Sequence, residues 1–354
     1  MSRFLNSRFA AIEPYTPGEQ PQGQMLKLNA NENPFPPSPA VRAALSGEQI
    51  DQMRLYPDML CQDLVQAVCE VYGVAPGEVL CGNGSDELLA FLFQTLCPHG
   101  AAFADITYSF YPVYAQVYGV PVQLVPLRED FRLAVEDYAG LPGTVFIANP
   151  NAPTTLALEK KQIIELLEQD RDRLVVVDEA YVDFGAQSAV ELIHTYDNLV
   201  VVKTLSKSYS LAGARVGFAL ACPAIIADLN TAKFCFNPYN INRLSLLAGA
   251  AALRDRDYFH HTVGRIIANR ERLQTGLQNL GFHVLDGQAN FLMAGRHPKL
   301  SAKDYFLALR ERGILIRYFS QQRLADFVRI TIGDEAATDA LLAATKAILE
   351  KAVF

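Results

Sequence analysis

Short apolar runs alternate along this chain with longer stretches whose apolar residues recur at helical spacing. The runs are rich in β-branched residues, are too short for helices and are bounded by Asn, Gly or Pro, so they are typical of buried strands. Such strands are predicted at 79–81, 101–104, 145–148, 173–178, 199–202 and 216–220, with helices at 39–45, 60–72, 85–93 and 159–168. This strand–helix–strand alternation predicts a mostly parallel sheet covered by helices on both faces.

The pattern changes after residue 220, where helical periodicity takes over. Helices are predicted at 244–253 and 260–280, and strands follow at 283–285, 290–294, 315–317 and 328–332. The expected fold class is therefore α/β, with a large domain at 31–240 and a smaller α+β domain at 241–354. Residues 1–30 are expected to form an N-terminal arm, because Pro, Gly and Gln in its first part favour extended chain over a packed element.

Composition excludes several classes of function. With 354 residues, 50% of them hydrophobic and 19% charged, the chain can bury a large core. The net charge of −7 argues against nucleic acid as the main partner, since no basic block offsets it. The N-terminus lacks a secretory pattern, no apolar run is long enough to cross a membrane, and the six cysteines and six histidines show no metal-ligand spacing. We expect a soluble cytoplasmic protein with reduced thiols and no metal site.

Two polar residues near strand ends carry the candidate chemistry. Asp178 closes the apolar run 173–178, and Lys207 follows the run 199–202 in a segment rich in Ser and Thr. Ligands of open α/β sheets bind at the carboxyl ends of the strands. An acid and a lysine there suit a ring bound between them, with a ring nitrogen facing the acid and an aldehyde carbon facing the amine. For the lysine segment alone, a solvated Ser/Lys loop is the alternative.

A third polar segment follows the predicted strand at 79–81. Gly82 and Gly84 allow a sharp turn, and Ser85 and Asp86 begin a helix whose free N–H groups favour a phosphate. Helix capping alone would also explain Ser and Asp at these positions. The segment lacks the third glycine of the dinucleotide fingerprint.

Six segments resemble motifs of the fold-type-I, class-II pyridoxal-phosphate-dependent aminotransferases. They are Leu28–Pro34, Asn83–Leu88, Asp178–Tyr181, Thr204–Lys207, Leu211–Arg215 and Val328–Gly333. The resemblance extends from about residue 11 to the end of the chain, and within that superfamily the chain is most similar to the histidinol-phosphate aminotransferase family. It implies a fold-type-I large domain, pyridoxal 5′-phosphate as cofactor and a homodimer.

The resemblance also implies a role for individual residues. Lys207, Asp178 and Tyr181 would be catalytic, with Lys207 holding the cofactor as a Schiff base and Asp178 keeping its ring nitrogen protonated. The implied cofactor-binding set is Gly84, Ser85, Asp86, Tyr108, Asn151, Asp178, Tyr181, Thr204, Ser206, Lys207 and Arg215, together with Tyr56 from the neighbouring subunit. Tyr15, Asn31, Arg317 and Arg329 would contact the substrates. The implied reaction converts L-histidinol phosphate and 2-oxoglutarate to imidazole-acetol phosphate and L-glutamate, in histidine biosynthesis.

The chain departs from the family pattern in its segment 145–155. Ala152 stands where relatives have an asparagine that bonds the phenolic oxygen of the cofactor, and Thr155 stands where they have glycine. Asn151 and Tyr181 are the two candidates to replace the missing contact.

Both substrate-binding arginines lie in predicted strands. Arginine in a buried strand is uncommon without an anionic partner. The family position implies that Arg329 binds the carboxylate of 2-oxoglutarate and that Arg317 binds the phosphate of the amino donor. A structural ion pair of Arg317 with Asp326 or Glu311 is the alternative.

Other functions remain open at this point. The same fold could act on aromatic amino acids or decarboxylate a phosphorylated one. A cofactor-binding regulator is disfavoured because the transaminase pattern occupies nearly the whole chain and leaves no appended domain. A dinucleotide-binding enzyme is disfavoured by the missing fingerprint.

Overall fold

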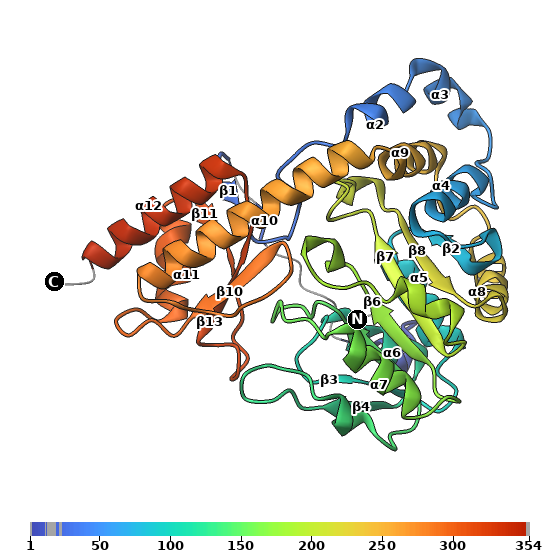
Figure 1. Cartoon of the computed structure of the whole chain (residues 1–354), viewed down its shortest axis with the longest axis horizontal. Coiled ribbons are helices and arrows are strands. Elements are labelled where there is room, and N and C mark those ends of the chain that lie inside the picture. Colours follow the sequence, from blue (N-terminus) through green and yellow to red (C-terminus); the bar gives the residue numbers. More distant parts are fainter. Residues whose placement is uncertain (1, 11, 13–18, 21–22, 352–354) are drawn as a thin grey trace.

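The computed structural model describes residues 2–10, 12, 19–20 and 23–351. These residues form a seven-stranded sheet and a four-stranded sheet, each with its own helices, together with a two-stranded pair (Figure 1). The larger sheet has seven strands: β2 (Val79–Gly82), β3 (Ala101–Ala104), β4 (Val122–Val125), β5 (Thr144–Ala148), β6 (Val175–Asp178), β7 (Leu199–Thr204) and β8 (Gly217–Ala221). Their order is β2-β8-β7-β6-β5-β3-β4, and β8 is antiparallel to both of its neighbours while the other pairs are parallel. The predicted α/β class is confirmed.

Helices cover this sheet, as the sequence pattern predicts. The helices of this domain are α2 (Pro39–Ala44), α3 (Gly47–Asp51), α4 (Gln62–Tyr72), α5 (Ser85–Thr95), α6 (Phe110–Tyr118), α7 (Lys160–Glu168), α8 (Pro223–Phe236) and α9 (Arg243–Arg254). Of these, α2 and α3 pack against α9 rather than on the sheet. Short 3₁₀ segments connect them: η1 (Gln52–Arg54), η2 (Pro76–Glu78), η3 (Val135–Tyr138), η4 (Val182–Phe184), η5 (Val190–His194) and η6 (Ala212–Ala214). Strands β6 and β7 are buried at every position, which explains their unbroken apolar, β-branched sequence.

The smaller sheet is antiparallel, and its strands come from the C-terminal part of the sequence. Its order is β12-β13-β10-β9, formed by β9 (His283–Val284), β10 (Phe291–Gly295), β12 (Arg317–Tyr318) and β13 (Phe327–Thr331). Helices α10 (Arg256–Asn279), α11 (Ala302–Glu311) and α12 (Glu335–Lys351) pack around it, and α10 runs from the large sheet to the small one (Figure 1). The predicted second domain with α and β elements is thus present.

One predicted strand is divided in two. The sequence indicates a single strand at 315–317, but β11 (Ile314–Leu315) pairs in parallel with β1 (Leu26–Lys27), whereas β12 pairs with β13. The arm segment therefore adds its own short ladder beside the small sheet. Local sequence cannot predict this pairing because its two partners are almost 290 residues apart.

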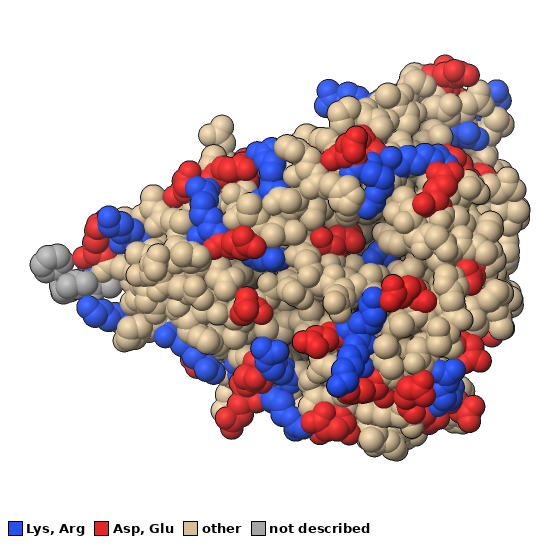
Figure 2. Space-filling view, in the orientation of Figure 1, with Lys and Arg blue, Asp and Glu red and all other residues tan. Residues whose placement is uncertain are grey.

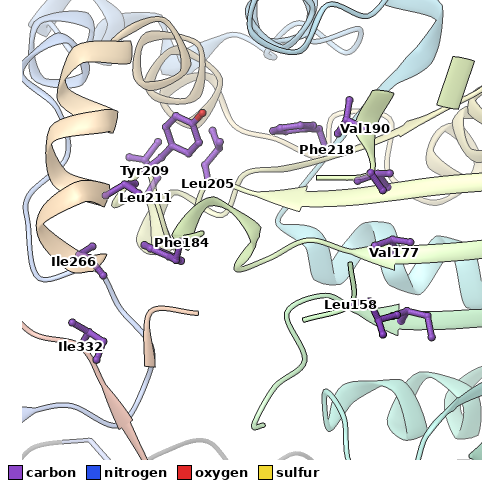
Figure 3. Close-up of a cluster of buried hydrophobic side chains, with 14 of the residues drawn as sticks. Leu158, Val177, Phe184, Val190, Leu205, Tyr209, Leu211, Phe218, Ile266 and Ile332 are labelled. Atoms are coloured by element: carbon purple, nitrogen blue, oxygen red, sulfur yellow. The ribbon is translucent and has the colours of Figure 1, made fainter. Parts of the chain in front are cut away.

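A continuous apolar core connects the two domains. Leu205 and Leu211, which follow β7, belong to the same cluster as Ile266 of α10 and Ile332 after β13 (Figure 3). Helix α9 approaches α4 closely because it carries small residues, and a Cβ on Gly249 would lie 3.0 Å from a Leu64 methyl group. The segment that carries the candidate lysine is therefore held between both domains.

The N-terminal arm contains a short helix. A short helix, α1 (Ser7–Ala10), occurs where an extended arm was expected, because the Asn6 side chain accepts a hydrogen bond of 2.9 Å from the Arg8 N–H at its start. On the face shown in Figure 2, acidic and basic side chains are interspersed. Among the helices of the described residues, none combines the length and the apolar character needed to cross a membrane.

Candidate active site

Asp178 is the last residue of β6 and is buried at the carboxyl edge of the large sheet. Its Oδ2 accepts a hydrogen bond of 3.0 Å from the Tyr111 hydroxyl, and its Oδ1 accepts one of 3.1 Å from the Ala180 N–H. Burial raises the pKa of Asp178 from 3.8 to about 6, although these two hydrogen bonds act in the opposite direction. A cation beside this carboxylate would therefore be favoured.

Lys207 lies in the turn that follows Thr204, the last residue of β7. The side-chain amide of Asn33 donates a hydrogen bond of 2.9 Å to the Lys207 carbonyl, which ties this turn to the segment before α2. The Lys207 ammonium is 5.8 Å from the centroid of the Tyr181 ring. The Tyr181 hydroxyl accepts a hydrogen bond of 3.0 Å from the Asn31 side chain, so the same segment contacts both Tyr181 and the Lys207 turn.

The first turn of α5 lies beside a basic and hydroxyl-rich wall. Gly84 has a φ of +79°, a backbone conformation that strains any residue with a Cβ, and it lies against the Arg215 guanidinium. Arg215 pairs with Asp86 at 2.7 Å, and the Tyr108 hydroxyl donates to the same carboxylate at 2.8 Å. The donors gathered here are the N–H groups of α5, the Arg215 guanidinium, and the hydroxyls of Thr204 and Ser206. Such a set suits a phosphate.

Two arginines face each other on the opposite wall, which belongs to the small sheet. Arg317 of β12 and Arg329 of β13 are directly opposed partners in the antiparallel register. Their guanidinium carbons lie 5.7 and 5.8 Å from the centroid of the Phe319 ring, and Arg329 also donates to the Asn29 carbonyl at 3.0 Å. Like charges at opposed strand positions repel each other, so an anion bound to both would be stabilising.

A single cavity of about 530 Å³ brings these groups together. Its volume suits a cofactor with a small substrate. Twelve of the sixteen site residues predicted from the sequence line it: Asn31, Ser85, Asp86, Tyr108, Asp178, Tyr181, Thr204, Ser206, Lys207, Arg215, Arg317 and Arg329. Gly84 directly precedes the lining residues of α5 without contributing a side chain of its own.

Two predicted residues that the structure describes, Asn151 and Tyr56, are not among the lining side chains. The Asn151 amide instead donates to the Ile106 carbonyl at 2.9 Å, and its oxygen accepts a 2.8 Å hydrogen bond from Thr107. Tyr56 is 78% exposed and stacks on Tyr239, with ring centroids 4.6 Å apart. Tyr15 lies outside the described residues.

Ala152, the first departure from the family pattern, lies at the active-site cavity. Ala152 lines the cavity and packs against Phe291 and Tyr181. Of the two candidates for the contact that Ala152 cannot make, only Tyr181 lines the cavity.

Thr155 adopts a φ of +65°, which is unusual for a β-branched residue. Its hydroxyl donates to the Phe291 carbonyl at 3.1 Å and accepts from the Ala289 N–H at 3.2 Å, so it bonds the large domain to the start of β10. A Cβ on Gly287 would lie 2.0 Å from a Thr155 methyl group. The threonine is therefore accommodated by a glycine on the other domain.

Sequence reasoning missed several residues that shape this site. The Tyr111 hydroxyl donates to Asp178, but local sequence does not distinguish Tyr111 from Tyr108 in the same aromatic segment. Asn33 belongs to the Leu28–Pro34 motif, which gives no signal that its side chain bonds the Lys207 turn. Phe319, which packs beside both arginines, follows Arg317 by two residues and has no separate signal in the sequence.

The geometry thus combines a lysine, a buried acid, a phosphate-binding turn and an arginine pair. The sequence profile of the family described as aminotransferase class I and II matches residues 23–344. The chain belongs to this family. In the part of the chain that the structure describes, no group of three or more His, Cys, Asp or Glu side chains could hold a metal ion.

Close relatives and solved structures agree with this assignment. The chain is 46% identical over 338 residues to a histidinol-phosphate aminotransferase of Clostridium acetobutylicum, covering 95% of this chain and 96% of the relative. It is 48% identical over 345 residues to one of Pseudomonas putida, covering 97% and 99%. The crystal structure of histidinol-phosphate aminotransferase from Sinorhizobium meliloti in complex with pyridoxal-5′-phosphate superposes with a TM-score of 0.86 at 24% identity, covering 99% of both chains.

These findings confirm three predictions made from the sequence. The chain is an aminotransferase, its fold is that of the fold-type-I enzymes, and its cofactor is pyridoxal 5′-phosphate. The resemblance to histidinol-phosphate aminotransferases is likewise confirmed.

Proposed function

We propose that this aminotransferase transfers the amino group of L-histidinol phosphate to 2-oxoglutarate, giving imidazole-acetol phosphate and L-glutamate. The observation that carries the proposal is the opposed pair of Arg317 and Arg329 in the cavity that also contains Lys207. Histidinol phosphate has no carboxylate, so its phosphate must be recognised. Two guanidinium groups side by side match phosphate and carboxylate oxygens and could serve each substrate in turn.

The residues of the cavity fit pyridoxal 5′-phosphate. Asp178 is buried and its pKa is raised to about 6, chiefly by burial, so a protonated ring nitrogen would supply the cation that this carboxylate lacks. At the other end, the start of α5 with Ser206 and Arg215 would hold the phosphate group. Tyr108 would stack on the ring, and Tyr181 would contact its edge where Ala152 leaves no polar group.

The proposed roles of Lys207 and Asp178 are complementary. When bound, the cofactor supplies a ring that withdraws electrons from the substrate carbon. Lys207 removes the proton from that carbon and returns it at the neighbouring position, as a general base and then a general acid. Asp178 holds a proton at the ring nitrogen by charge pairing. Asn33 keeps the Lys207 backbone in place through its 2.9 Å hydrogen bond.

We also propose that the active unit is a homodimer in which Tyr56 acts on the cofactor phosphate of the neighbouring subunit. Exposed apolar side chains lie close to Tyr56 in the chain: Met53, Leu55 and Leu60 are 56%, 46% and 53% exposed. A patch of this kind is typical of a protein–protein contact. The Tyr56 ring stacks on Tyr239, so the contact surface would include the loop after α8.

The test is to offer amino donors one at a time to the cofactor-loaded protein while its visible spectrum is recorded. We expect histidinol phosphate to be converted with a kcat/KM well above those of phenylalanine, tyrosine and aspartate, and glutamate to form when 2-oxoglutarate is added. Preference for an aromatic amino acid would contradict the proposed substrate. Release of carbon dioxide from a phosphorylated amino acid would contradict the reaction type.

A further inference from the structure

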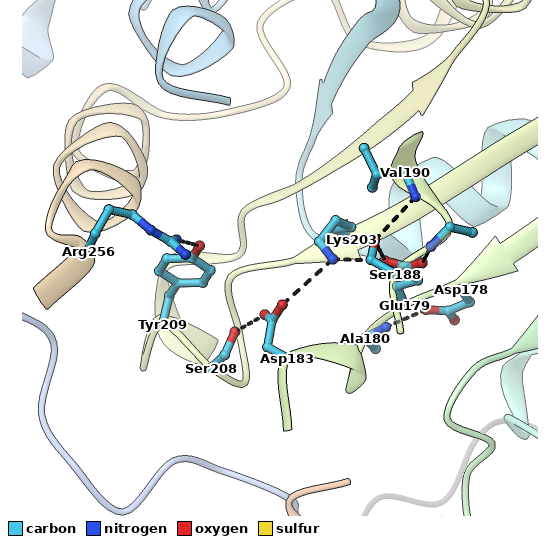
Figure 4. Close-up of polar contacts among 11 residues, drawn as sticks. Asp178, Glu179, Ala180, Asp183, Ser188, Val190, Lys203, Ser208, Tyr209 and Arg256 are labelled. Atoms are coloured by element: carbon cyan, nitrogen blue, oxygen red, sulfur yellow. Dashed lines mark hydrogen bonds and ion pairs between the residues drawn. The ribbon is translucent and has the colours of Figure 1, made fainter. Parts of the chain in front are cut away.

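A group of charged side chains lies beneath the active site and is not explained by the proposed reaction. Lys203 of β7 is 3% exposed, and its ammonium lies 2.9 Å from Oε2 of Glu179, whose side chain is fully buried (Figure 4). The same ammonium is 3.7 Å from Oδ1 of Asp183 in η4. Its charge is therefore shared by two carboxylates from different segments.

Strand geometry explains why these charges lie on the far side of the sheet from the cavity. Successive residues of a strand point to opposite faces. Asp178 and Thr204 line the cavity, so Glu179 and Lys203, their chain neighbours, point away from it. The Glu179 N–H continues the ladder by donating to the Val202 carbonyl at 2.8 Å.

Each partner in this group is adjacent to a proposed active-site residue. Glu179 follows Asp178, and Asp183 is two residues from Tyr181. The hydroxyl of Ser208, which follows Lys207, donates to Asp183 Oδ2 at 2.5 Å (Figure 4). Three segments that bring Asp178, Tyr181 and Lys207 to the cavity are thus joined around one ammonium.

We propose that Lys203 is a positioning residue, which sets the relative placement of Asp178, Tyr181 and Lys207 from beneath the sheet. The inference rests on the proposed function, since it assigns the ion group a role in catalysis rather than in stability alone. Removing the ammonium would leave the buried Glu179 and the partly buried Asp183 as two carboxylates that repel each other. The segments that they anchor would then move apart.

The protonation state of Lys203 agrees with this role. Burial lowers the pKa of its ammonium, but the charges of Glu179 and Asp183 outweigh burial and hold this pKa above the ordinary value. Glu179 accepts two further hydrogen bonds, from the Ser188 hydroxyl at 2.7 Å and the Ala189 N–H at 2.5 Å. Asp183 has its Ser208 bond. The Ser188 hydroxyl shares Glu179 Oε2 with Lys203, whereas Ala189 bonds Glu179 Oε1 and Ser208 bonds Asp183 Oδ2. Each carboxylate therefore links Lys203 to a further segment.

The test compares three variants of the cofactor-loaded enzyme. Lys203→Met removes the ammonium, and Lys203→Met combined with Glu179→Gln removes it without leaving Glu179 charged. Ser208→Ala cuts only the bond between Asp183 and the Lys207 turn, so it carries the test even where the lysine variants fold poorly. The matched control is Arg173→Met, which removes a buried cation at the other end of β6 that donates to the Tyr138 carbonyl.

The melting temperature of each variant is measured first. Two quantities are then compared well below it, with KM taken from the same kinetics. One is kcat per bound cofactor, and the other is the fraction of cofactor that borohydride traps on Lys207 in a fixed time. We expect both lysine variants to lower kcat about 10-fold or more with little change in KM, because small displacements of reacting groups are costly. Ser208→Ala should lower kcat less, and all three should trap less cofactor. The double variant should melt at a higher temperature than Lys203→Met without recovering kcat.

Native kcat per site and native trapping in all three variants would overturn the inference, as would an equal loss of kcat in Arg173→Met. The wild-type protein separates this failure from failure of the proposed function. If borohydride traps no cofactor on wild-type Lys207, the proposed function fails. If wild-type Lys207 is trapped and the variants behave like it, only the positioning role fails.

Discussion

Arg317 and Arg329 occupy directly opposed positions in the antiparallel pair of β12 and β13, with the Phe319 ring beside both guanidinium groups. Arg329 is additionally fixed by its hydrogen bond to the Asn29 carbonyl. This arrangement gives the small domain one wall of the cavity and concentrates positive charge there. Substrate choice should therefore depend on these two residues.

The first prediction concerns Arg317. Arg317→Met should lower kcat/KM for histidinol phosphate by roughly 30- to 150-fold, since a bidentate phosphate contact contributes about 2–3 kcal/mol in a partly dry pocket. The kcat/KM for phenylalanine, which has no phosphate, should fall much less. Steady-state kinetics with both donors checks this.

The matched control for Arg317 is Arg312→Met, an exposed arginine at the end of α11. Arg312→Met should leave kcat/KM for both amino donors unchanged. An equal loss for the two donors in Arg317→Met would show that Arg317 serves the structure rather than the phosphate.

The second prediction concerns Asp178 and pH. Its pKa is raised by burial from 3.8 to about 6, so the apo-protein loses stability from this group as pH rises from about 4 to 6. The loss amounts to about 3 kcal/mol at pH 7. Asp178→Asn should therefore stabilise the apo-protein at pH 7 and have little effect near pH 4, as measured by urea unfolding. The same variant should lower turnover of the loaded enzyme by about 10²-fold or more.

Cofactor binding provides the control for Asp178. In the loaded protein the Asp178 carboxylate would pair with the protonated ring nitrogen of the cofactor. Asp178→Asn should therefore destabilise the loaded protein relative to wild type, opposite to its effect on the apo-protein. An apo-protein variant that is less stable than wild type at pH 7, or a loaded variant with near-native turnover, would refute the assignment.

The third prediction concerns Thr155, whose hydroxyl bonds both Phe291 and Ala289 across the domains. Thr155→Val preserves the shape but leaves a buried carbonyl and a buried N–H unsatisfied. We expect it to lower the free energy of unfolding by about 2–3 kcal/mol, whereas Thr155→Ser should lower it by less than about 1 kcal/mol. Denaturant unfolding checks this. Equal values for the two variants would mean that the hydroxyl does not stabilise the contact.

The fourth prediction concerns the proposed dimer. Tyr56→Ala should weaken cofactor binding, and Lys207→Ala should be inactive. A mixture of the two should regain activity, because a hybrid dimer contains one site with both native residues. Mass spectrometry of the mixture must first show that subunits exchange. No recovery after proven exchange would contradict the action of Tyr56 across the interface.

Much of the fold follows from local sequence because its central strands are buried on both faces. Unbroken apolar runs placed β6 and β7 correctly, and the polar residues at their ends, Asp178 and Lys207, line one cavity as expected. The motif at the start of α5 also indicates its turn, since Gly84 has a φ of +79°, which favours glycine.

Side-chain partners from distant segments could not be predicted in this way. The Asn151 side-chain amide could bind a ligand, but it already accepts a hydrogen bond from Thr107 and donates one to the Ile106 carbonyl. Lys203 is buried together with two carboxylates, Glu179 and Asp183, that local sequence does not pair with it. The division of the predicted strand at 315–317 depends on pairing with the arm. Each of these outcomes is set by tertiary contacts rather than by local periodicity.

The central claim is that Lys207 is the residue to which the cofactor is attached. The direct measurement is borohydride reduction of the cofactor-loaded wild-type protein, followed by proteolysis and mass spectrometry of the labelled peptide. We predict that Lys207 carries the label, with one cofactor per chain. A label on Lys203, which lies four residues earlier in the same strand–turn segment, or on any other lysine, would contradict the account.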